Sequence, residues 1–135
     1  TIVHTPDGDL AFQHYFVRER CTPVVTGFTY RGAAEAAVPP DLLALEEEIE
    51  AVIVCPSNPF ISIGPVLAVG GMRDWLRGLA VPVVAVSPLI GGQAVKGPTA
   101  KMFGELGLSV TKKTAAKRTG KKILHDSQKV AIRNG

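Results

Sequence analysis

The sequence has few of the residues that cross-link a small protein. Its 135 residues include two cysteines and three histidines, and neither set shows the spacing of a metal site. Cys21 and Cys55 therefore do not indicate a disulfide scaffold, and we expect reduced thiols in a cytoplasmic protein. The sequence also offers no Ser/His/Asp arrangement and no convincing acid/base pair, so nucleophilic catalysis by a triad is not predicted.

Signals for export and for membrane insertion are also missing. No basic segment followed by an apolar run opens the chain, so we predict no secretory signal. The longest uncharged stretch, residues 51–72, contains Pro56, Pro59 and Pro65. It therefore predicts strand, loop and helix rather than a membrane span. Because the chain begins at Thr1 and not at Met, we expect further residues upstream.

Acidic residues are almost absent from the end of the chain. Residues 111–135 hold eight Lys and Arg against one Asp, a net +7, whereas residues 1–110 carry a net −4. The tail has no clean hydrophobic period, so we predict a weakly ordered basic segment appended to an α/β domain at residues 1–110. Its lysines would bind nucleic acid by counterion release, but no aromatic residue lies among them, and nucleic acid is not the expected partner.

Hydrophobic residues make up 46% of the chain and charged residues 20%, values typical of a single globular domain. Residues 10–17 fit both strand and helix, and we favour a helix over 12–20. Elsewhere strands and helices alternate, which predicts a three-layer α/β/α sandwich with a mostly parallel sheet. The predicted strands are 2–5, 24–30, 51–55, 81–86 and a start at 108–110; the further helices are 41–49, from 62, 73–79 and 98–106. The helix over 41–49 should bury one face formed by Leu42, Leu45 and Ile49. The strand over 51–55 should be buried on both faces.

Two uncharged segments, 51–65 and 81–99, each run from a predicted strand through a polar loop into a helix. Ligands bind at the carboxyl ends of strands in open α/β sheets. The first loop, residues 55–59, and the second loop, residues 87–99, are rich in Pro, Gly and small polar residues. Together they predict a site built from backbone amides and short side chains, which suits a phosphate group.

The first loop has two interpretations. Ser57 and Asn58 can donate to a phosphate oxygen, and the amides from Ser62 to Gly64 would lie at a helix N-terminus, which favours anions. Alternatively, Ser57, Asn58 and Ser62 are only turn and helix-capping residues. For this loop alone, the structural alternative is the better supported.

The second loop is rich in glycine but is not a P-loop. Gly92 and Gly97 have the P-loop spacing, yet Pro98 stands where that motif needs lysine. Lys96 can reach a phosphate as a point charge or remain a solvated surface lysine. Gly91 and Gly92 either allow a ligand to approach closely or simply turn the chain.

Three segments, Gly8–Val17, Cys55–Val69 and Val83–Met102, resemble the 2-phospho-L-lactate transferase family of coenzyme F(420) biosynthesis. The resemblance covers about residues 1–110. It implies an incomplete Rossmann-like core. It also implies transfer of a phospholactyl or related phospho-acid group from a guanosine-diphosphate-activated donor to the ribityl hydroxyl of 7,8-didemethyl-8-hydroxy-5-deazariboflavin, with release of GMP and with Mg²⁺ as cofactor.

The resemblance also implies roles for individual residues. Gln13 and Tyr15 would lie on the deazaflavin side, although packing in the core is the simpler interpretation of this aromatic segment. The guanine-nucleotide side would be formed by small and polar residues of both loops, namely Ser57, Asn58, Ser62, Gly64, Ser87, Gly91, Gly92, Lys96 and Gly97.

Members of this family are about twice as long as this chain. Their Gly-rich phosphate loop and the acidic residue expected to hold magnesium would precede Thr1, so we expect no metal ligand here and an inactive isolated chain. The alternative function is a non-enzymatic guanine-nucleotide-binding α/β module. A sheet without its first strands exposes an edge, which favours a homo-oligomer.

Overall fold

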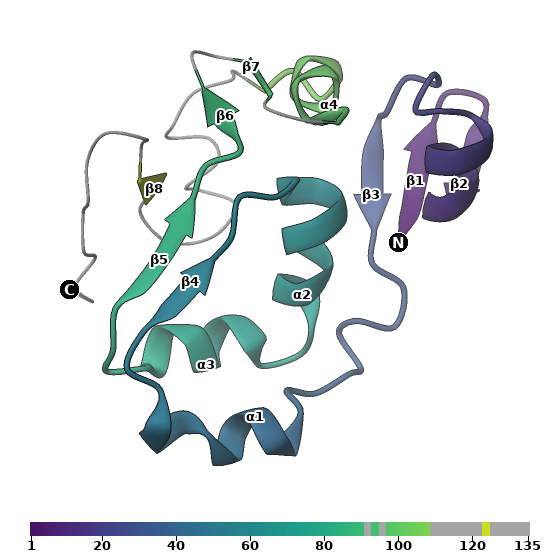
Figure 1. Ribbon diagram of the computed structural model, residues 1–135. Helices are drawn as coiled ribbons and strands as arrows, with labels where there is room; N and C mark the ends of the chain where they lie inside the picture. The colour runs from purple at the N-terminus through teal and green to yellow at the C-terminus, as the bar shows by residue number, and fades with distance from the viewer. Residues whose placement is uncertain (91–92, 95–96, 109–122, 125–135) are drawn as a thin grey trace.

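Two small sheets of different kinds divide the chain (Figure 1). The computed structural model describes residues 1–90, 93–94, 97–108 and 123–124. One sheet is antiparallel, with the order β2-β1-β3; the other is parallel, with the order β4-β5-β8. A short antiparallel pair joins β6 and β7. The strands are β1 (Ile2–Thr5), β2 (Gly8–Ala11), β3 (Gly27–Thr29), β4 (Val52–Val54), β5 (Val83–Val86), β6 (Leu89–Ile90), β7 (Gln93–Ala94) and β8 (Ile123–Leu124).

The helical segments are short. The α-helices are α1 (Pro40–Ala44), α2 (Gly64–Ala68), α3 (Met72–Gly78) and α4 (Thr99–Glu105). Three further turns are wound differently: π-helical η1 (His14–Arg18) and η3 (Pro59–Ile63), and the 3₁₀ turn η2 (Glu46–Glu48). None of the helices in the described ranges is long and apolar enough to cross a membrane.

The antiparallel unit begins with a hairpin. Gly8 adopts a positive φ of 125° after the turn at residues 6–7, and Thr5 Oγ1 donates to Gly8 O at 2.7 Å. The ambiguous residues 10–17 divide between the two predicted states, because β2 ends at Ala11 and η1 follows. The predicted helix is thus confirmed, in π-helical form.

His4 links all three strands of this sheet. Its Nδ1 lies 2.6 Å from Asp9 Oδ1 on β2, and its Nε2 lies 2.8 Å from Thr29 Oγ1 on β3. A threonine hydroxyl, an imidazole and a carboxylate therefore meet as a cross-strand network. Gly27 packs against this ring, since a Cβ at Gly27 would lie 3.3 Å from His4 Cδ2.

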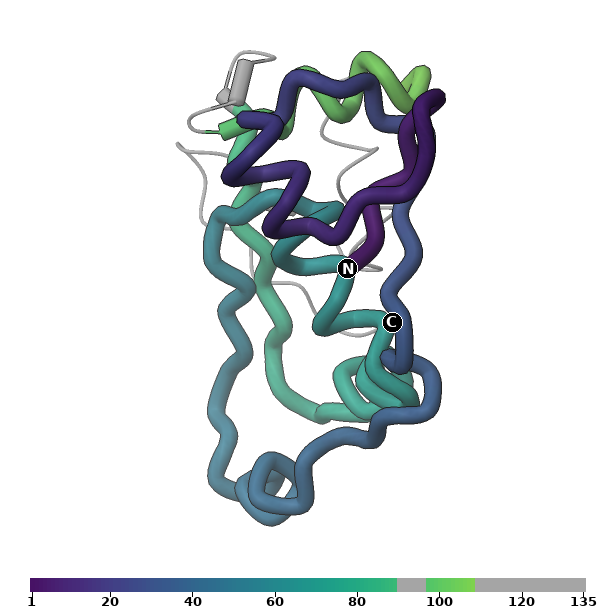
Figure 2. Tube along the Cα trace, turned by 90° about the vertical axis from the view of Figure 1, so that its right-hand side faces the viewer, coloured from purple at the N-terminus to yellow at the C-terminus, as the bar shows by residue number. Residues whose placement is uncertain are grey.

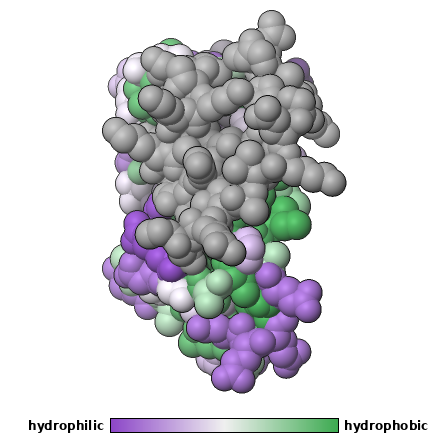
Figure 3. Space-filling model, turned by 90° about the vertical axis from the view of Figure 1, so that its left-hand side faces the viewer, coloured by the Kyte–Doolittle hydropathy of each residue, from purple (hydrophilic) through white to green (hydrophobic). Residues whose placement is uncertain are grey.

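The parallel unit has the α/β arrangement of an incomplete Rossmann-like fold. The chain leaves β4, passes through η3, α2 and α3, and returns as β5 in parallel register (Figure 1). Val83 and Ala85 are buried, but Ile53 is 66% exposed. The prediction that the strand over 51–55 is buried on both faces is therefore wrong, because strand side chains alternate and the face bearing Ile53 is open. Figure 3 shows the molecule from the left-hand side of Figure 1, and in the lower part of that view hydrophobic surface lies beside hydrophilic residues.

The helix predicted at 41–49 is present but breaks early. It ends at Ala44 and tightens into η2, so its expected apolar face is incomplete and Leu45 is 47% exposed. Two glycines with positive φ lie between or after helices: Gly71 separates α2 from α3 with φ 79°, and Gly107 follows α4 with φ 62°. Leu108 is not in a strand, and the rest of the strand start predicted at 108–110 lies outside the described residues.

One core joins the two units. The ring of Phe60, at the start of η3, stacks on the ring of Phe28 of β3, with 5.5 Å between the ring centroids. It also meets the ring of Phe103 of α4 edge-on, with 5.0 Å between the centroids. Figures 1 and 2 agree that α4 lies beside the N-terminal unit. The predicted basic tail is described only at β8, which pairs with β5; its remaining residues lie outside the described part.

Candidate functional site

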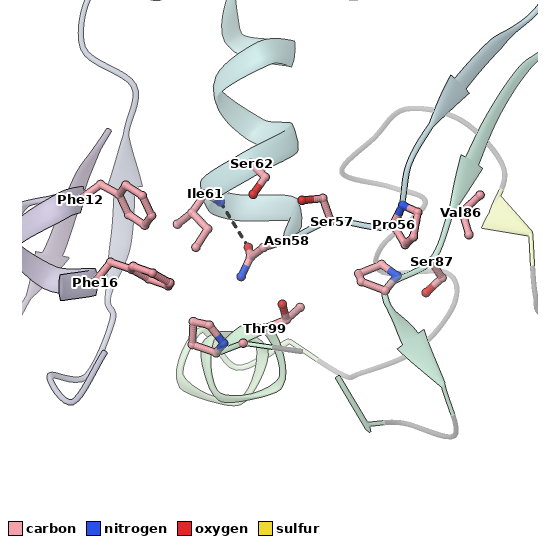
Figure 4. Close-up of a pocket in the computed structure, with 13 residues that line it drawn as sticks. Phe12, Phe16, Pro56, Ser57, Asn58, Ile61, Ser62, Val86, Ser87 and Thr99 are labelled. Atoms are coloured by element: carbon pink, nitrogen blue, oxygen red, sulfur yellow. Dashed lines mark hydrogen bonds between the residues drawn. The ribbon is translucent and has the colours of Figure 1, made fainter. Parts of the chain in front are cut away.

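A pocket of about 560 Å³ opens where the carboxyl ends of β4 and β5 face η1 and the start of α4 (Figure 4). Its size is typical of a small-molecule site. The lining combines four elements and is neutral throughout: Phe12, Phe16, Pro56, Ser57, Asn58, Ile61, Ser62, Val86, Ser87, Pro88, Gly97, Pro98 and Thr99.

The two loops singled out from the sequence meet in this pocket. Five of the predicted nucleotide-side residues line it: Ser57, Asn58, Ser62, Ser87 and Gly97. Gly91, Gly92 and Lys96 lie outside the described residues. The meeting follows from the parallel register of β4 and β5, which brings the ends of both strands to one edge of the sheet.

Asn58 shapes the first loop as a helix cap. Its Oδ1 accepts hydrogen bonds from the amides of Phe60 at 2.8 Å and Ile61 at 3.2 Å, and its Nδ2 donates to Met102 Sδ at 3.3 Å. The side chain is buried, and these contacts use its oxygen and one of its N–H groups. The capping alternative is therefore realised for Asn58, which fixes the loop to α4.

The helix starts three residues earlier than the sequence suggested. With Asn58 as the cap and Pro59 in the first turn, the amides of Ser62 and Ile63 both donate to Asn58 O at 3.1 Å. The amide of Gly64 donates to Pro59 O. The expected anion site at these three amides is therefore wrong, because each is already satisfied within the helix.

The serine hydroxyls differ in availability. Ser87 Oγ accepts from the amide of Leu89 at 3.1 Å, as in a serine turn. The structure records no hydrogen bond from the side-chain hydroxyl of Ser57 or Ser62 to another group of the described residues, and Ser62 is exposed. In Figure 4 both hydroxyls lie near the start of η3, above Thr99 in that view. Ser57 and Ser62 are thus the hydroxyls best placed to donate to a ligand.

An aromatic wall faces these hydroxyls, and the sequence-based list did not include it. Phe12 and Phe16 are tilted by 35° with ring centroids 5.4 Å apart, and Phe16 is 44% exposed. Both point toward the loops in Figure 4. Their i, i+4 spacing on a helix is the sequence signal for this pair, and the same spacing is equally compatible with packing in the core.

The remaining predicted residues lie off the pocket lining. Gln13 is exposed beside the wall, and Tyr15 is fully buried, with Oη donating to Cys21 O at 3.2 Å. Burial raises the pKa of Tyr15 to about 12, with smaller contributions from the charges of Cys21 and Glu105. Gly64 packs under Tyr30, where a Cβ would collide with the Tyr30 hydroxyl.

The described residues do not fit a magnesium site. No three His, Cys, Asp or Glu side chains gather within the described ranges so as to hold a metal ion. The pocket lining contributes hydroxyl, amide and aromatic groups and no carboxylate, whereas Mg²⁺ is bound through carboxylates and phosphates. No step of a reaction is therefore assigned to a metal held by this part of the chain.

Comparison with known proteins decides the family. The model of the family described as 2-phospho-L-lactate transferase CofD matches residues 1–132. The chain belongs to this family. The match continues past residue 110, where the resemblance noted in the sequence ended.

Curated relatives carry two names. The chain is 39% identical to the 2-phospho-L-lactate transferase of Methanosarcina mazei over 82% of its own length, and 42% identical to that of Methanopyrus kandleri over 79%. It is 32% identical over 81% to a phosphoenolpyruvate transferase of Mycobacterium avium. These matches cover 36%, 34% and 32% of the relatives, so the chain spans about a third of their length, less than the half expected.

Proposed function

We propose that this chain forms part of a transferase that moves a phospholactyl, or related phospho-acid, group from a guanosine-diphosphate-activated donor to the ribityl hydroxyl of the deazaflavin, releasing GMP. Family membership supports the reaction class. The observation that carries the proposal is the pocket itself, which puts the Ser57 and Ser62 hydroxyls opposite the aromatic pair Phe12 and Phe16.

Each wall suits one partner of the reaction. Hydroxyl donors bind phosphate oxygens, and the aromatic pair offers a flat apolar surface to a fused ring. About 560 Å³ holds one small molecule, not two whole substrates, so the pocket would take the reacting ends of donor and acceptor. Group transfer to a hydroxyl gains chiefly from positioning, which these neutral side chains supply without a covalent nucleophile.

Titration of the 135-residue chain with GDP tests the donor half of this proposal. We expect saturable binding that weakens about tenfold in the double variant Ser57→Ala/Ser62→Ala, a loss of about 1.4 kcal/mol. The control is Thr26→Ala, an exposed hydroxyl outside the pocket lining. Equal affinity in the double variant and the wild type would refute the assignment of these hydroxyls.

A non-enzymatic guanine-nucleotide-binding module is the second candidate. The neutral lining and the lack of a metal cluster among the described residues favour binding without turnover by this chain alone. We accordingly expect no GMP from the isolated chain with Mg²⁺ and both substrates. Measured product would show that this chain contains the catalytic groups and would exclude the binding-module alternative.

A further inference from the structure

A polar cluster on α4 lies outside the pocket lining. Lys101 Nζ lies 2.5 Å from Glu105 Oε1, and the two residues are one turn apart on α4. The side chain of Lys101 is 35% exposed and that of Glu105 15%. Because the two charges lose much of their hydration, the pair contributes little net free energy to folding. Its main effect is to fix the positions of the two side chains.

Each of the two side chains also binds the main chain of residues 23–25. Lys101 Nζ donates to Pro23 O at 2.8 Å, and Glu105 Oε2 accepts from the amide of Val25 at 3.1 Å. The carbonyl needs a donor and the amide needs an acceptor, so the polarity of the pair is fixed. This bond to Glu105 also explains why β3 begins at Gly27 and not at residue 24, where the strand was predicted.

Lys101 further reaches η1, the segment that carries the aromatic wall. Its Nζ lies 3.5 Å from Tyr15 Oη and 5.9 Å from the centre of that ring. Tyr15 in turn holds Cys21, since its hydroxyl donates to Cys21 O and its carbonyl accepts from the Cys21 amide at 3.0 Å. One lysine therefore joins α4, Tyr15 of η1 and the segment that follows.

The segment between η1 and these contacts is strained. Arg20 and Cys21 have positive φ values of 49° and 60°, which cost free energy for residues other than glycine. Such conformations persist only where the surroundings hold them, and they are found at sites where geometry matters. Here Tyr15 binds Cys21, and Lys101 and Glu105 bind residues 23 and 25, so hydrogen bonds to these three side chains stabilise the strained segment.

We propose that Lys101 and Glu105 are positioning residues for the pocket. By binding residues 23–25 they fix η1 against α4, and so they set the spacing between Phe16 and Thr99 at the start of α4, which both line the pocket (Figure 4). This inference rests on the proposed function, because the spacing matters for a ring bound against Phe16.

Titration with 7,8-didemethyl-8-hydroxy-5-deazariboflavin tests the proposal. We expect Lys101→Met, which keeps the stem but removes the charge, to weaken binding about tenfold. Lys101→Arg should stay within about threefold of the wild type, because Arg still donates to Pro23 O. The swapped pair Lys101→Glu/Glu105→Lys should fail to recover affinity, since neither new side chain matches its main-chain partner. Wild-type affinity in Lys101→Met or in the swap would overturn the proposal.

Amide hydrogen exchange separates this proposal from the proposed function. In Lys101→Met the amides of residues 14–25 should exchange faster, whereas those of β4 and β5 should not change. If the wild type does not bind the deazaflavin, the proposed function fails and exchange alone decides the positioning role. Uniform acceleration, or none, would refute it. Should Lys101→Met not fold, Glu105→Gln is the milder variant, because it keeps the acceptor for the Val25 amide; the same local pattern is expected.

Discussion

The antiparallel and parallel units are stabilised in different ways. In the antiparallel sheet, the His4 side chain joins all three strands, and Lys101 of the neighbouring α4 binds the segment that leads into β3. In the parallel sheet, β4 leaves Ile53 66% exposed, whereas the exposed large hydrophobic residues of the N-terminal part, Phe16, Val17 and Val24, lie outside its strands. The antiparallel sheet is therefore held by directional hydrogen bonds between side chains, whereas the apolar side chains of the parallel sheet are incompletely buried in the described part of the chain.

The pocket lies at the junction of these two units. The antiparallel unit supplies the aromatic wall, and the parallel unit supplies the polar loops at its strand ends. Geometry at the wall is set by directional bonds, whereas geometry at the loops depends on packing and on the Asn58 cap. The following four experiments test that division, from the largest expected effect to the smallest.

Phe60→Ala should have the largest effect, because this buried ring joins both units through Phe28 and Phe103. Truncating a buried Phe costs about 3–5 kcal/mol. Urea unfolding should show that loss, with the two units no longer unfolding together. Phe16→Ala removes a ring that is 44% exposed and is the matched control, with an expected loss under about 1 kcal/mol. Similar losses in both variants would contradict the described core.

Gly70→Ala tests the contact between the parallel unit and the segment that leads into it. A Cβ at Gly70 would lie 2.6 Å from Ala36 O and 2.7 Å from Ala34 O. Because backbone atoms cannot move aside easily, we expect a loss of about 1–3 kcal/mol in thermal unfolding. Gly78→Ala, in the last turn of α3 with nothing within 4 Å, should instead raise stability by up to about 1 kcal/mol. The same sign for both substitutions would contradict this packing.

A pair of Thr substitutions compares the two sheets directly. Val3 of β1 is fully buried, so Val3→Thr places a hydroxyl in the core at a cost of about 1–3 kcal/mol. Ile53→Thr on β4 should change stability by no more than about 0.5 kcal/mol, because its side chain is mostly in solvent. Chemical denaturation measures both, and a large loss at Ile53 would show that its face is covered in solution.

Tyr15→Phe should have the smallest effect, and the difference in stability from the wild type should change only at high pH. The pKa of Tyr15 is about 12 in the folded protein against an ordinary value of 10.0, so folding favours the neutral hydroxyl. Its contribution to stability is complete below pH 10 and is lost as the pH rises toward 12. The gap in urea midpoint between wild type and Tyr15→Phe should therefore narrow above pH 10. A gap that stays constant from pH 9 to 11.5 would exclude this linkage.

Local chemistry made part of this molecule predictable. Gly71 separates α2 from α3 and Gly107 follows α4, both with the left-handed φ that glycine tolerates, and the apolar runs that became β4 and β5 indicated parallel strands whose ends would meet. The start of η3 at Pro59 was also predictable, because Asn58 followed by Pro59 is a typical N-cap and first-turn residue. This pair is a stronger start signal than Ser62, where the helix was predicted.

Other features depend on contacts that the sequence pattern does not encode. An apolar run such as residues 51–55 has the same pattern whether one face or two are covered, so the exposure of Ile53 was not predictable. Glu105 binds the amide of Val25, 80 residues earlier in the chain, and no periodicity connects them. The aromatic wall was ambiguous because i, i+4 aromatic residues suit both a core and a ligand surface.

The central claim is that the junction pocket binds a flat ring against Phe16. Titration of the 135-residue chain with the deazaflavin, for wild type, Phe16→Ala and Val17→Ala, tests it most directly. Val17 is the adjacent residue, is 65% exposed and does not line the pocket. We predict saturable binding that weakens about tenfold in Phe16→Ala, about 1.4 kcal/mol, and is unchanged in Val17→Ala. Equal affinity in all three proteins, or no binding by the wild type, would contradict the account.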